Sequence, residues 1–356
     1  MSAAAPAEPT ALDLFMGKML ADMGAAMAGA TIMMGDRLGL YRAMRELGPT
    51  DAKRLAAATG TSMRLVGEWL AAQATSGYVT FDPSSGMFSL SPEQAMVFAD
   101  EDSPVFLAGG YNVVASAWRD EPRIAEGFRN GRGLGWHERD TCLFHGTERF
   151  FRPGYKHHLV QEWLPALDGV TAKLERGAEV ADVGCGHGAS TLIMARAYPK
   201  SRFTGFDYHP ASVATAREQA AREGLSDRVR FEVASAQDLP AKGFDLACMF
   251  DCLHDMGDPA GAARSLRGAV ARDGTLMVVE PRAGNSLPEN MNPVGRVYYA
   301  ASAMICTPAS LNQPGQAGLG AQAGPRRIAE VIREGGFGQV RVAAETPFNM
   351  VIEARA

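Results

Sequence analysis

The chain has 356 residues, a length that fits two domains or three compact pieces. Its 46% hydrophobic and 21% charged content is that of an ordinary globular protein, and its net charge of −5 argues against a general binder of nucleic acid or anionic membranes. No apolar run of about 18 residues exists, so we expect no membrane contact. Residues 1–15 lack the features of a signal peptide, and the five cysteines form no CxxC pair. We therefore expect free thiols and a cytoplasmic location.

The first elements, over residues 11–47, have apolar side chains at helical spacing, among them Phe15, Met19, Met23 and Met27. A stripe this wide at the start of the chain predicts a homodimer interface, with ordinary core as the alternative.

Helical patterns at 51–60 and 61–77 come next, and two short strands about Pro83-Ser-Ser-Gly86 follow them. Three helices and a hairpin in this order predict a winged helix-turn-helix domain over 1–103. Such domains often bind DNA. Here residues 1–100 hold seven Lys/Arg against ten Asp/Glu, so we expect a dimerisation domain that does not bind nucleic acid.

Residues 104–175 are predicted to be a mostly helical connector that covers the active site. From 176 to 356 strands and helices alternate, which predicts the α/β class, a Rossmann-like doubly wound sheet of seven strands. A Gly/Pro/Asn-rich insertion at 283–324 interrupts this domain. Its apolar middle favours an ordered helix, and we expect it to form a lid or a wall for the acceptor, with a structural insertion as the alternative.

A glycine-rich turn with Gly184, Gly186 and Gly188 follows the first strand of this domain. The spacing suits two ligand classes, dinucleotides and S-adenosylmethionine. The strand ends carry acidic residues, and Lys and Arg are scarce around the turn. Four carboxylates at one crevice repel a pyrophosphate but suit a sulfonium cation and ribose hydroxyls. These carboxylates belong to Asp182, Asp207, Asp238 and Asp251.

Residues 178–281 resemble class I S-adenosylmethionine-dependent methyltransferases, through the motif from Asp182 to Gly188, the acidic Asp207 and the run Ala236-Gln237-Asp238. With the winged helix and the phrase CLHDMGDP, nearly the whole chain resembles the small-molecule methyltransferases typified by plant phenolic O-methyltransferases and, more nearly, their bacterial winged-helix relatives. The resemblance implies S-adenosylmethionine as cofactor and S-adenosylhomocysteine as product. It places Asp207 at the ribose, Asp238 at the adenine amino group and Tyr208 against the adenine ring. The residues expected at the cofactor are Asp182, Gly184, Gly186, Gly188, Asp207, Tyr208, Ala236, Gln237, Asp238 and Asp251.

His254 is the leading catalytic candidate, because in the plant-like enzymes a histidine in the matching LHDW phrase acts as base. Met256 stands here in place of the tryptophan, which weakens the case for a phenolic acceptor. The alternative is that His254 only lines the pocket. Glu280 could orient His254, hold an acceptor or pair with Arg282.

Further residues are expected at the acceptor because they flank the covering loop or lie in the insertion: Trp136, His137, His145, Arg152, Tyr155 and Tyr298. His254, Asp255 and Glu280 together could hold a metal, but no HExxH or matched histidine spacing supports one, so we expect none. The predicted function is methyl transfer to a small molecule, with O- or S-methylation favoured. The alternatives are a DNA-binding regulator that senses S-adenosylmethionine, an NAD-dependent oxidoreductase and a catalytically silent binding protein.

Overall fold

A computed structural model describes residues 8–356 of the chain. The chain forms two compact units, residues 1–115 and 116–356. Residues 1–7 lie outside the described residues. The prediction that residues 1–15 lack a signal peptide falls partly on them. Among residues 8–356 no helix is both long enough and apolar enough to cross a membrane.

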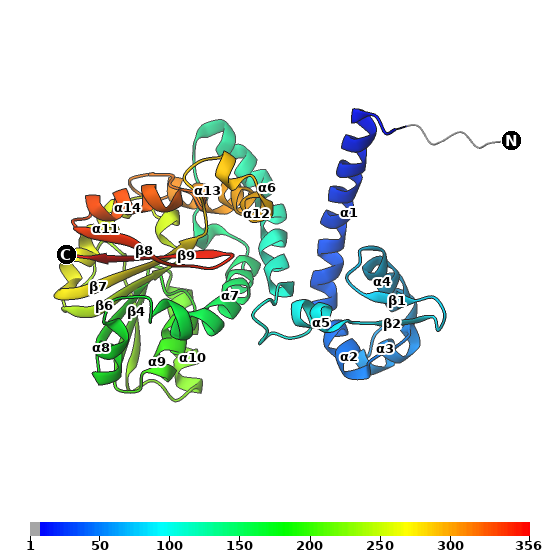
Figure 1. The fold of residues 1–356 in the computed structure, drawn as a ribbon, viewed down its shortest axis with the longest axis horizontal. Coiled ribbons are helices and arrows are strands. Elements are labelled where there is room, and N and C mark those ends of the chain that lie inside the picture. The colour runs from blue at the N-terminus through cyan, green and yellow to red at the C-terminus, as the bar shows by residue number, and fades with distance from the viewer. Residues whose placement is uncertain (1–7) are drawn as a thin grey trace. The chain divides into compact units, whose positions relative to one another are not determined.

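The amino-terminal unit has the predicted helices followed by a hairpin (Figure 1). Its elements are α1 (Ala11–Arg37), α2 (Leu40–Leu47), α3 (Ala52–Thr59), α4 (Met63–Thr75), β1 (Thr80–Asp82), β2 (Met87–Ser89) and α5 (Pro92–Phe98). Side-chain hydrogen bonds join three of the helices: Tyr41 Oη donates to Gln73 Oε1 at 2.5 Å, and Gln73 Nε2 donates to Thr31 Oγ1 at 2.7 Å. Because these groups are buried, their pairing fixes how α1, α2 and α4 pack. The winged helix-turn-helix prediction is confirmed.

One face of α1 is left without a partner in the described chain. Phe15, Met19, Met23 and Met27 are 58%, 42%, 63% and 71% exposed. The helix buries a different set of residues near its carboxyl-terminal end, Ala28, Gly29, Ile32 and Gly35. The apolar stripe is therefore not part of the core of its own unit.

The second unit is built on a seven-stranded sheet of order β5-β4-β3-β6-β7-β9-β8. The strands are β3 (Glu179–Val183), β4 (Arg202–Asp207), β5 (Val229–Val233), β6 (Phe244–Phe250), β7 (Val270–Pro281), β8 (Gln339–Glu345) and β9 (Asn349–Arg355). The first five are parallel, and β9 pairs antiparallel with both β7 and β8. The order reverses between β3 and β6, which is the point where open α/β sheets bind ligands.

Helices cover both faces of this sheet (Figure 1). Along β3, Val180 packs with α8 (Val170–Arg176), α9 (Ala189–Ala197) and α10 (Pro210–Arg222), whereas its neighbour Ala181 packs with α11 (Pro259–Ala269) and α14 (Gly324–Glu334). Alternate residues of a strand point to opposite faces, so a strand that is buried on both sides, as β3 is at Val180 and Ala181, belongs in a doubly covered sheet. The predicted fold class is confirmed.

Two further groups of helices lie beyond the sheet. The first consists of α6 (Tyr111–Asn130), η2 (Trp136–Glu138), α7 (Cys142–Gly154) and η3 (Tyr155–Trp163). The second comes from the 283–324 insertion and consists of η5 (Pro288–Asn290), α12 (Pro293–Ala301), η6 (Ser302–Cys306) and α13 (Thr307–Leu311). The helix predicted in the insertion is present. Both η3 and η6 are π-helices, a form that is rare and often found at functional sites.

Candidate functional site

The glycine turn after β3 leaves bare backbone at the switch point of the sheet. Gly184, Gly186 and Gly188 all have positive φ, at 75°, 51° and 85°. An added Cβ on Gly184 would lie 2.7 Å from Cys252 Sγ, and one on Gly188 would lie 2.6 Å from the Phe231 ring. Gly186 instead has no atom within 4 Å of that position. Two glycines therefore serve packing, and the middle one faces open space where a ligand can approach the backbone.

Asp182 is directed into the protein. It is buried at the end of β3, and its Oδ2 accepts hydrogen bonds from Ser190 Oγ at 2.7 Å and Thr191 Oγ1 at 2.5 Å. Burial raises its pKa to about 6. The carboxylate thus ties the start of α9 to the strand and shapes the turn from behind.

Asp207 lies at the end of β4, on the open side of the same turn. Its Oδ2 accepts from Gly186 N at 2.9 Å, and its Oδ1 accepts from His209 N at 2.8 Å. Burial raises its pKa, and the two backbone hydrogen bonds act in the opposite direction. Tyr208 beside it is 45% exposed. This carboxylate is therefore fixed by backbone donors next to the bare stretch at Gly186.

The covering loop packs on this edge through aromatic side chains. Phe144 stacks on His209 with ring centroids 4.9 Å apart, and Trp136 meets Phe144 edge-on at 5.6 Å. His187 Nδ1 of the turn lies 2.8 Å from Glu148 Oε2. These contacts hold α7 beside the glycine turn, as expected for a segment that covers a site.

The Ala236-Gln237-Asp238 run follows β5. Gln237 and Asp238 are exposed and Ala236 is half-buried. Gln237 Nε2 donates to Asp258 O at 3.3 Å, which links this run to the start of α11. The exposed Asp238 carboxylate is available to a ligand at the outer end of the edge.

Asp251, the first residue after β6, is held in an unusual conformation with φ of 50°. Its Oδ2 accepts from Tyr155 Oη at 2.7 Å and its Oδ1 from Asn349 Nδ2 at 2.8 Å. Burial raises its pKa to about 8. Positive φ costs free energy in a residue other than glycine, and such strain is common at active sites. Asn349, on the antiparallel β9, had no local sequence signal that pointed to the site.

His254 and Glu280 form a buried pair where β6 and β7 end. His254 Nδ1 lies 2.5 Å from Glu280 Oε2, and Glu280 Oε1 accepts from the backbone N of Leu253 at 3.0 Å. Burial alone would lower the pKa of His254, but the carboxylates of Glu280 and Asp255 raise it well above its usual value. Glu280 therefore contacts His254, as the orienting role would require. Arg282 instead lies 4.0 Å from Glu345.

Asp255 completes this group from the other side of the ring. Its Oδ1 lies 3.1 Å from His254 Nε2, and its Oδ2 accepts from Trp136 Nε1 at 3.0 Å. The Cys306 thiol at the end of η6 lies beside both residues, with the ligand atoms of all three within 4.8 Å of one another. Sequence reasoning considered Asp255 only as a metal ligand and Cys306 only as part of the insertion.

The residues predicted at the acceptor are not all gathered at one place. Trp136 and Tyr155 contact the buried carboxylates described above. Tyr298 is also buried, and its Oη donates to Phe348 O at 2.9 Å. His137 and His145 are exposed, and Arg152 is half-buried. The structure therefore brings three of the six to the edge formed by β6 and β7.

A cavity of about 540 Å³ lies between α6 and the helices of the insertion. Its lining is mostly apolar, and the exposed ring of Phe128 stands at it. The lining residues are Ile124, Gly127, Phe128, Arg132, Tyr299, Ser302, Ala303, Thr307, Pro308, Leu311, Leu319, Gly320 and Gln322. The insertion thus forms one wall of an apolar pocket, next to the π-helix that carries Cys306.

Comparison with known proteins agrees with this architecture. A family model described as a methyltransferase domain matches residues 174–335, and one described as an Rv2258c-like winged HTH domain matches residues 26–99. The predicted resemblance is confirmed at the level of the domains: a stretch that matches a winged HTH domain precedes one that matches a methyltransferase domain.

Similar proteins include 27-O-demethylrifamycin SV methyltransferase of Amycolatopsis mediterranei, 31% identical over 40% of this chain and 55% of that protein. Acetylserotonin O-methyltransferase of Mus musculus molossinus is 29% identical over 71% of this chain and 70% of the length of that protein. The crystal structure of human N-acetylserotonin methyltransferase in complex with S-adenosylmethionine has the same fold. Its TM-score is 0.68 at 18% identity, over 99% of both chains. The chain spans about a quarter to about half of the length of the first curated relatives it matches.

Proposed function

We propose that this chain, in which a winged helix-turn-helix domain precedes an S-adenosylmethionine-dependent methyltransferase domain, transfers a methyl group to an oxygen atom of a small molecule. The observation that carries the proposal is the edge at β3 and β4. There Gly186 leaves its backbone open, and Asp207 is fixed beside it by two backbone donors. A carboxylate at this place accepts hydrogen bonds from ribose hydroxyls and attracts a cation, whereas it would repel the pyrophosphate of a dinucleotide.

The residues around this edge fit S-adenosylmethionine, which supplies a methyl group already activated on a sulfonium ion. We assign the ribose to Asp207, the adenine amino group to the exposed Asp238, and the face of the adenine ring to Tyr208. Gly186 would let the ligand approach the main chain. Asp182 shapes the turn from behind, because its side chain is buried and its Oδ2 accepts from two hydroxyls of the following helix.

The chemistry left to the protein is to align the acceptor, exclude water and receive its proton. We assign the proton to His254. Glu280 holds its Nδ1, and Nε2 faces Asp255 and Cys306. The carboxylates of Glu280 and Asp255 raise the pKa of His254 and so stabilise the imidazolium that forms when Nε2 receives the proton. Oxygen is the proposed acceptor atom because a hydroxyl needs such a base, and because two of the similar proteins are named for methylation at oxygen.

A test of this proposal is to incubate the full chain with S-adenosylmethionine and a panel of small phenols, alcohols, hydroxy acids and thiols, and to measure S-adenosylhomocysteine. We expect release above the acceptor-free rate for at least one hydroxyl compound. Turnover of NAD(H) with the same panel and no S-adenosylhomocysteine would favour the oxidoreductase instead.

We also propose that the chain acts as a homodimer in the cytoplasm, joined through the exposed stripe of α1. Four large apolar side chains on one helix face are costly to leave in water. In sedimentation experiments Met23→Lys should shift the protein to a monomer, while Thr75→Lys, at an exposed polar position of α4, should not. A wild-type monomer at micromolar concentration would contradict the proposal.

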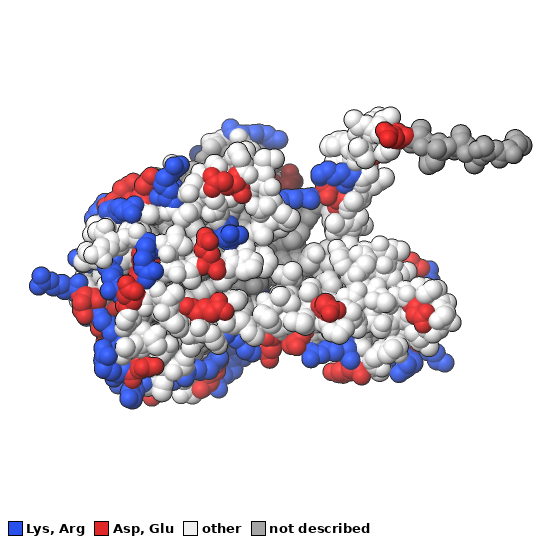
Figure 2. Space-filling model, in the orientation of Figure 1, with Lys and Arg blue, Asp and Glu red and all other residues white. Residues whose placement is uncertain are grey.

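The charges of the first unit support a role other than DNA binding. Arg64 and Glu68 are the charged residues of α4, the expected recognition helix, and they pair with each other at 2.5 Å. On the face drawn in Figure 2, the Lys and Arg side chains of this unit are scattered among acidic ones. Retention of duplex DNA by nanomolar protein in a low-salt gel shift would overturn this view.

A further inference from the structure

We propose that His254, Asp255 and Cys306 form a binding site for a divalent transition-metal ion of the zinc class, with a coordination position left open for an oxygen of the acceptor. The inference rests on the proposed methyl transfer and changes one of its assignments. With a metal present, His254 is a ligand, and the proton of the acceptor hydroxyl would pass to water, because coordination to a metal ion lowers the pKa of a bound hydroxyl.

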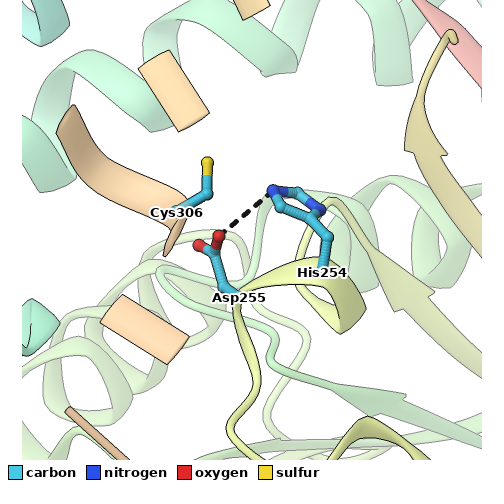
Figure 3. A group of neighbouring side chains, drawn as sticks. All are labelled: His254, Asp255 and Cys306. Carbon is cyan, nitrogen blue, oxygen red and sulfur yellow. Dashed lines mark ion pairs between the residues drawn. The ribbon is translucent and has the colours of Figure 1, made fainter. Parts of the chain in front are cut away.

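The three side chains lie around a common space (Figure 3). His254 Nε2 and Asp255 Oδ1 are 3.1 Å apart, and the ligand atoms of all three residues lie within 4.8 Å of one another. Bonds of about 2.0–2.3 Å from zinc to nitrogen, oxygen and sulfur place neighbouring ligands of a tetrahedron about 3.3–3.8 Å apart. The group is therefore nearly at coordination spacing before any ion is added.

One ligand atom of the group, Asp255 Oδ1, has no partner other than His254 among the residues that the structure describes. Asp255 Oδ1 is buried in a side chain that is only 10% exposed, and its one contact is the ion pair with His254 Nε2, with no further hydrogen bond in the described structure. Its other oxygen is already bonded to Trp136 Nε1. A buried carboxylate oxygen in this state is costly, and a cation shared with His254 and Cys306 would satisfy it.

The outer contacts hold each ligand in place from behind. Glu280 binds the far nitrogen of His254, which is the carboxylate–histidine arrangement common at metal sites. Trp136 orients Asp255. Arg139 donates to the carbonyls of Met304 at 2.8 Å and Ile305 at 3.2 Å, directly before Cys306, and so fixes the end of η6.

Arg139 is itself a cation close to the group. Its guanidinium is buried and lies 3.5 Å from Asp120 Oδ2, so an acidic partner balances its charge. The remaining charged groups at His254 are the acidic side chains of Glu280 and Asp255. The local charge therefore leaves room for a cation.

The donor set points to the class of ion. One nitrogen, one carboxylate oxygen and one sulfur suit zinc and its neighbours, whereas magnesium and calcium prefer oxygen alone. Three protein ligands with a free fourth position are typical of catalytic zinc sites. The sequence predicted no metal because it has no HExxH motif or matched histidine spacing, and Cys306, in a distant segment, was not considered as a ligand.

Cobalt(II) is the probe for this site, because it replaces zinc and absorbs light when bound to a thiolate. We expect the full chain, after treatment with a chelator and dialysis, to bind one cobalt per chain with a thiolate-to-cobalt band in the near ultraviolet. Cys306→Ser should remove that band, and Trp136→Phe should weaken cobalt binding about 10- to 100-fold through loss of the outer contact. Cys142→Ser, a half-buried thiol outside the group, is the matched control and should keep the band.

Binding of S-adenosylhomocysteine, measured on the same samples, separates this inference from the proposed function. We expect chelator-treated protein and Cys306→Ser to bind it as the wild type does, which also shows that both are folded. Normal binding of S-adenosylhomocysteine without cobalt binding, or a thiolate band that persists in Cys306→Ser, would overturn the metal site and leave the methyltransferase proposal intact. Absence of S-adenosylhomocysteine binding would overturn the methyltransferase proposal itself.

Discussion

The two halves of the sheet edge are built in different ways. At β3 and β4 the site consists of main chain and one carboxylate, all within a short stretch around Gly186 and Asp207, and it is open. At β6 and β7 it consists of buried side chains, with His254 enclosed between Glu280 and Asp255. The first half suits a ligand that is recognised by shape and hydrogen bonds, and the second suits chemistry that must be kept from water. Variants should therefore affect binding on one side and turnover on the other.

The largest effect is expected at His254. His254→Gln should lower kcat about 10²- to 10⁴-fold, because a positioned general base or metal ligand is lost, while affinity for S-adenosylhomocysteine stays within about twofold. The control is His158→Gln. Among the described residues, the side chain of His158 pairs with Glu162, at 3.0 Å, and with neither His254 nor Glu280. An unchanged kcat would contradict a chemical role for His254 and would mean that this edge contributes only by aligning the acceptor.

On the other side, Asp207→Asn should weaken S-adenosylhomocysteine binding about 10- to 100-fold, since a hydrogen bond to a charged group contributes about 1.5–3 kcal/mol. Calorimetry measures the affinity. Asp227→Asn, an exposed aspartate with no assigned role, should bind as the wild type does. Equal affinities for both variants would remove Asp207 from the ligand site.

The two glycines of the turn offer a finer comparison. Gly184→Ala should destabilise the fold, because its Cβ would press on Cys252 Sγ. Gly186→Ala has space, so we expect a loss of only about 1 kcal/mol from its positive φ, together with weaker ligand binding. Melting temperatures and ligand titrations separate the two effects. Unchanged ligand binding by Gly186→Ala would mean that the open space at Gly186 is not used by a ligand.

The smallest effect is a pH dependence of stability that arises at Asp251. Burial raises the pKa of its carboxyl from 3.8 to about 8 in the folded chain. A raised carboxyl pKa stabilises the fold at low pH, and this contribution is lost as the pH rises from about 4 to 8. Asp251→Asn is neutral throughout, so its melting temperature should gain on that of the wild type between pH 5 and 8.5. Parallel curves for the two proteins would show that Asp251 ionises normally.

The same contrast explains what could be predicted from the sequence. The sheet and the glycine turn were readable because strand alternation and glycine spacing are local patterns. Two kinds of information were missing. The contacts of Tyr155 with Asp251 and of Trp136 with Asp255 join residues 96 and 119 positions apart. The π-helix that ends at Cys306 shifts the direction of its side chains in a way that helical periodicity does not reveal.

Asp182 shows the limit of the electrostatic reasoning. Its position at a strand end predicted a carboxylate facing the ligand, as for Asp207. Both residues end adjacent parallel strands, but Asp182 accepts from Ser190 and Thr191 of the following helix, and its side chain is buried. Strand position alone does not distinguish a carboxylate that shapes a turn from one that faces the crevice.

The central claim is that the acidic edge at Gly186 and Asp207 binds S-adenosylmethionine in preference to a dinucleotide. Calorimetric titration of the full chain with S-adenosylhomocysteine and, separately, with NADH tests it most directly. We expect micromolar affinity for S-adenosylhomocysteine and no measurable heat with NADH. Micromolar binding of NADH without binding of S-adenosylhomocysteine would contradict it.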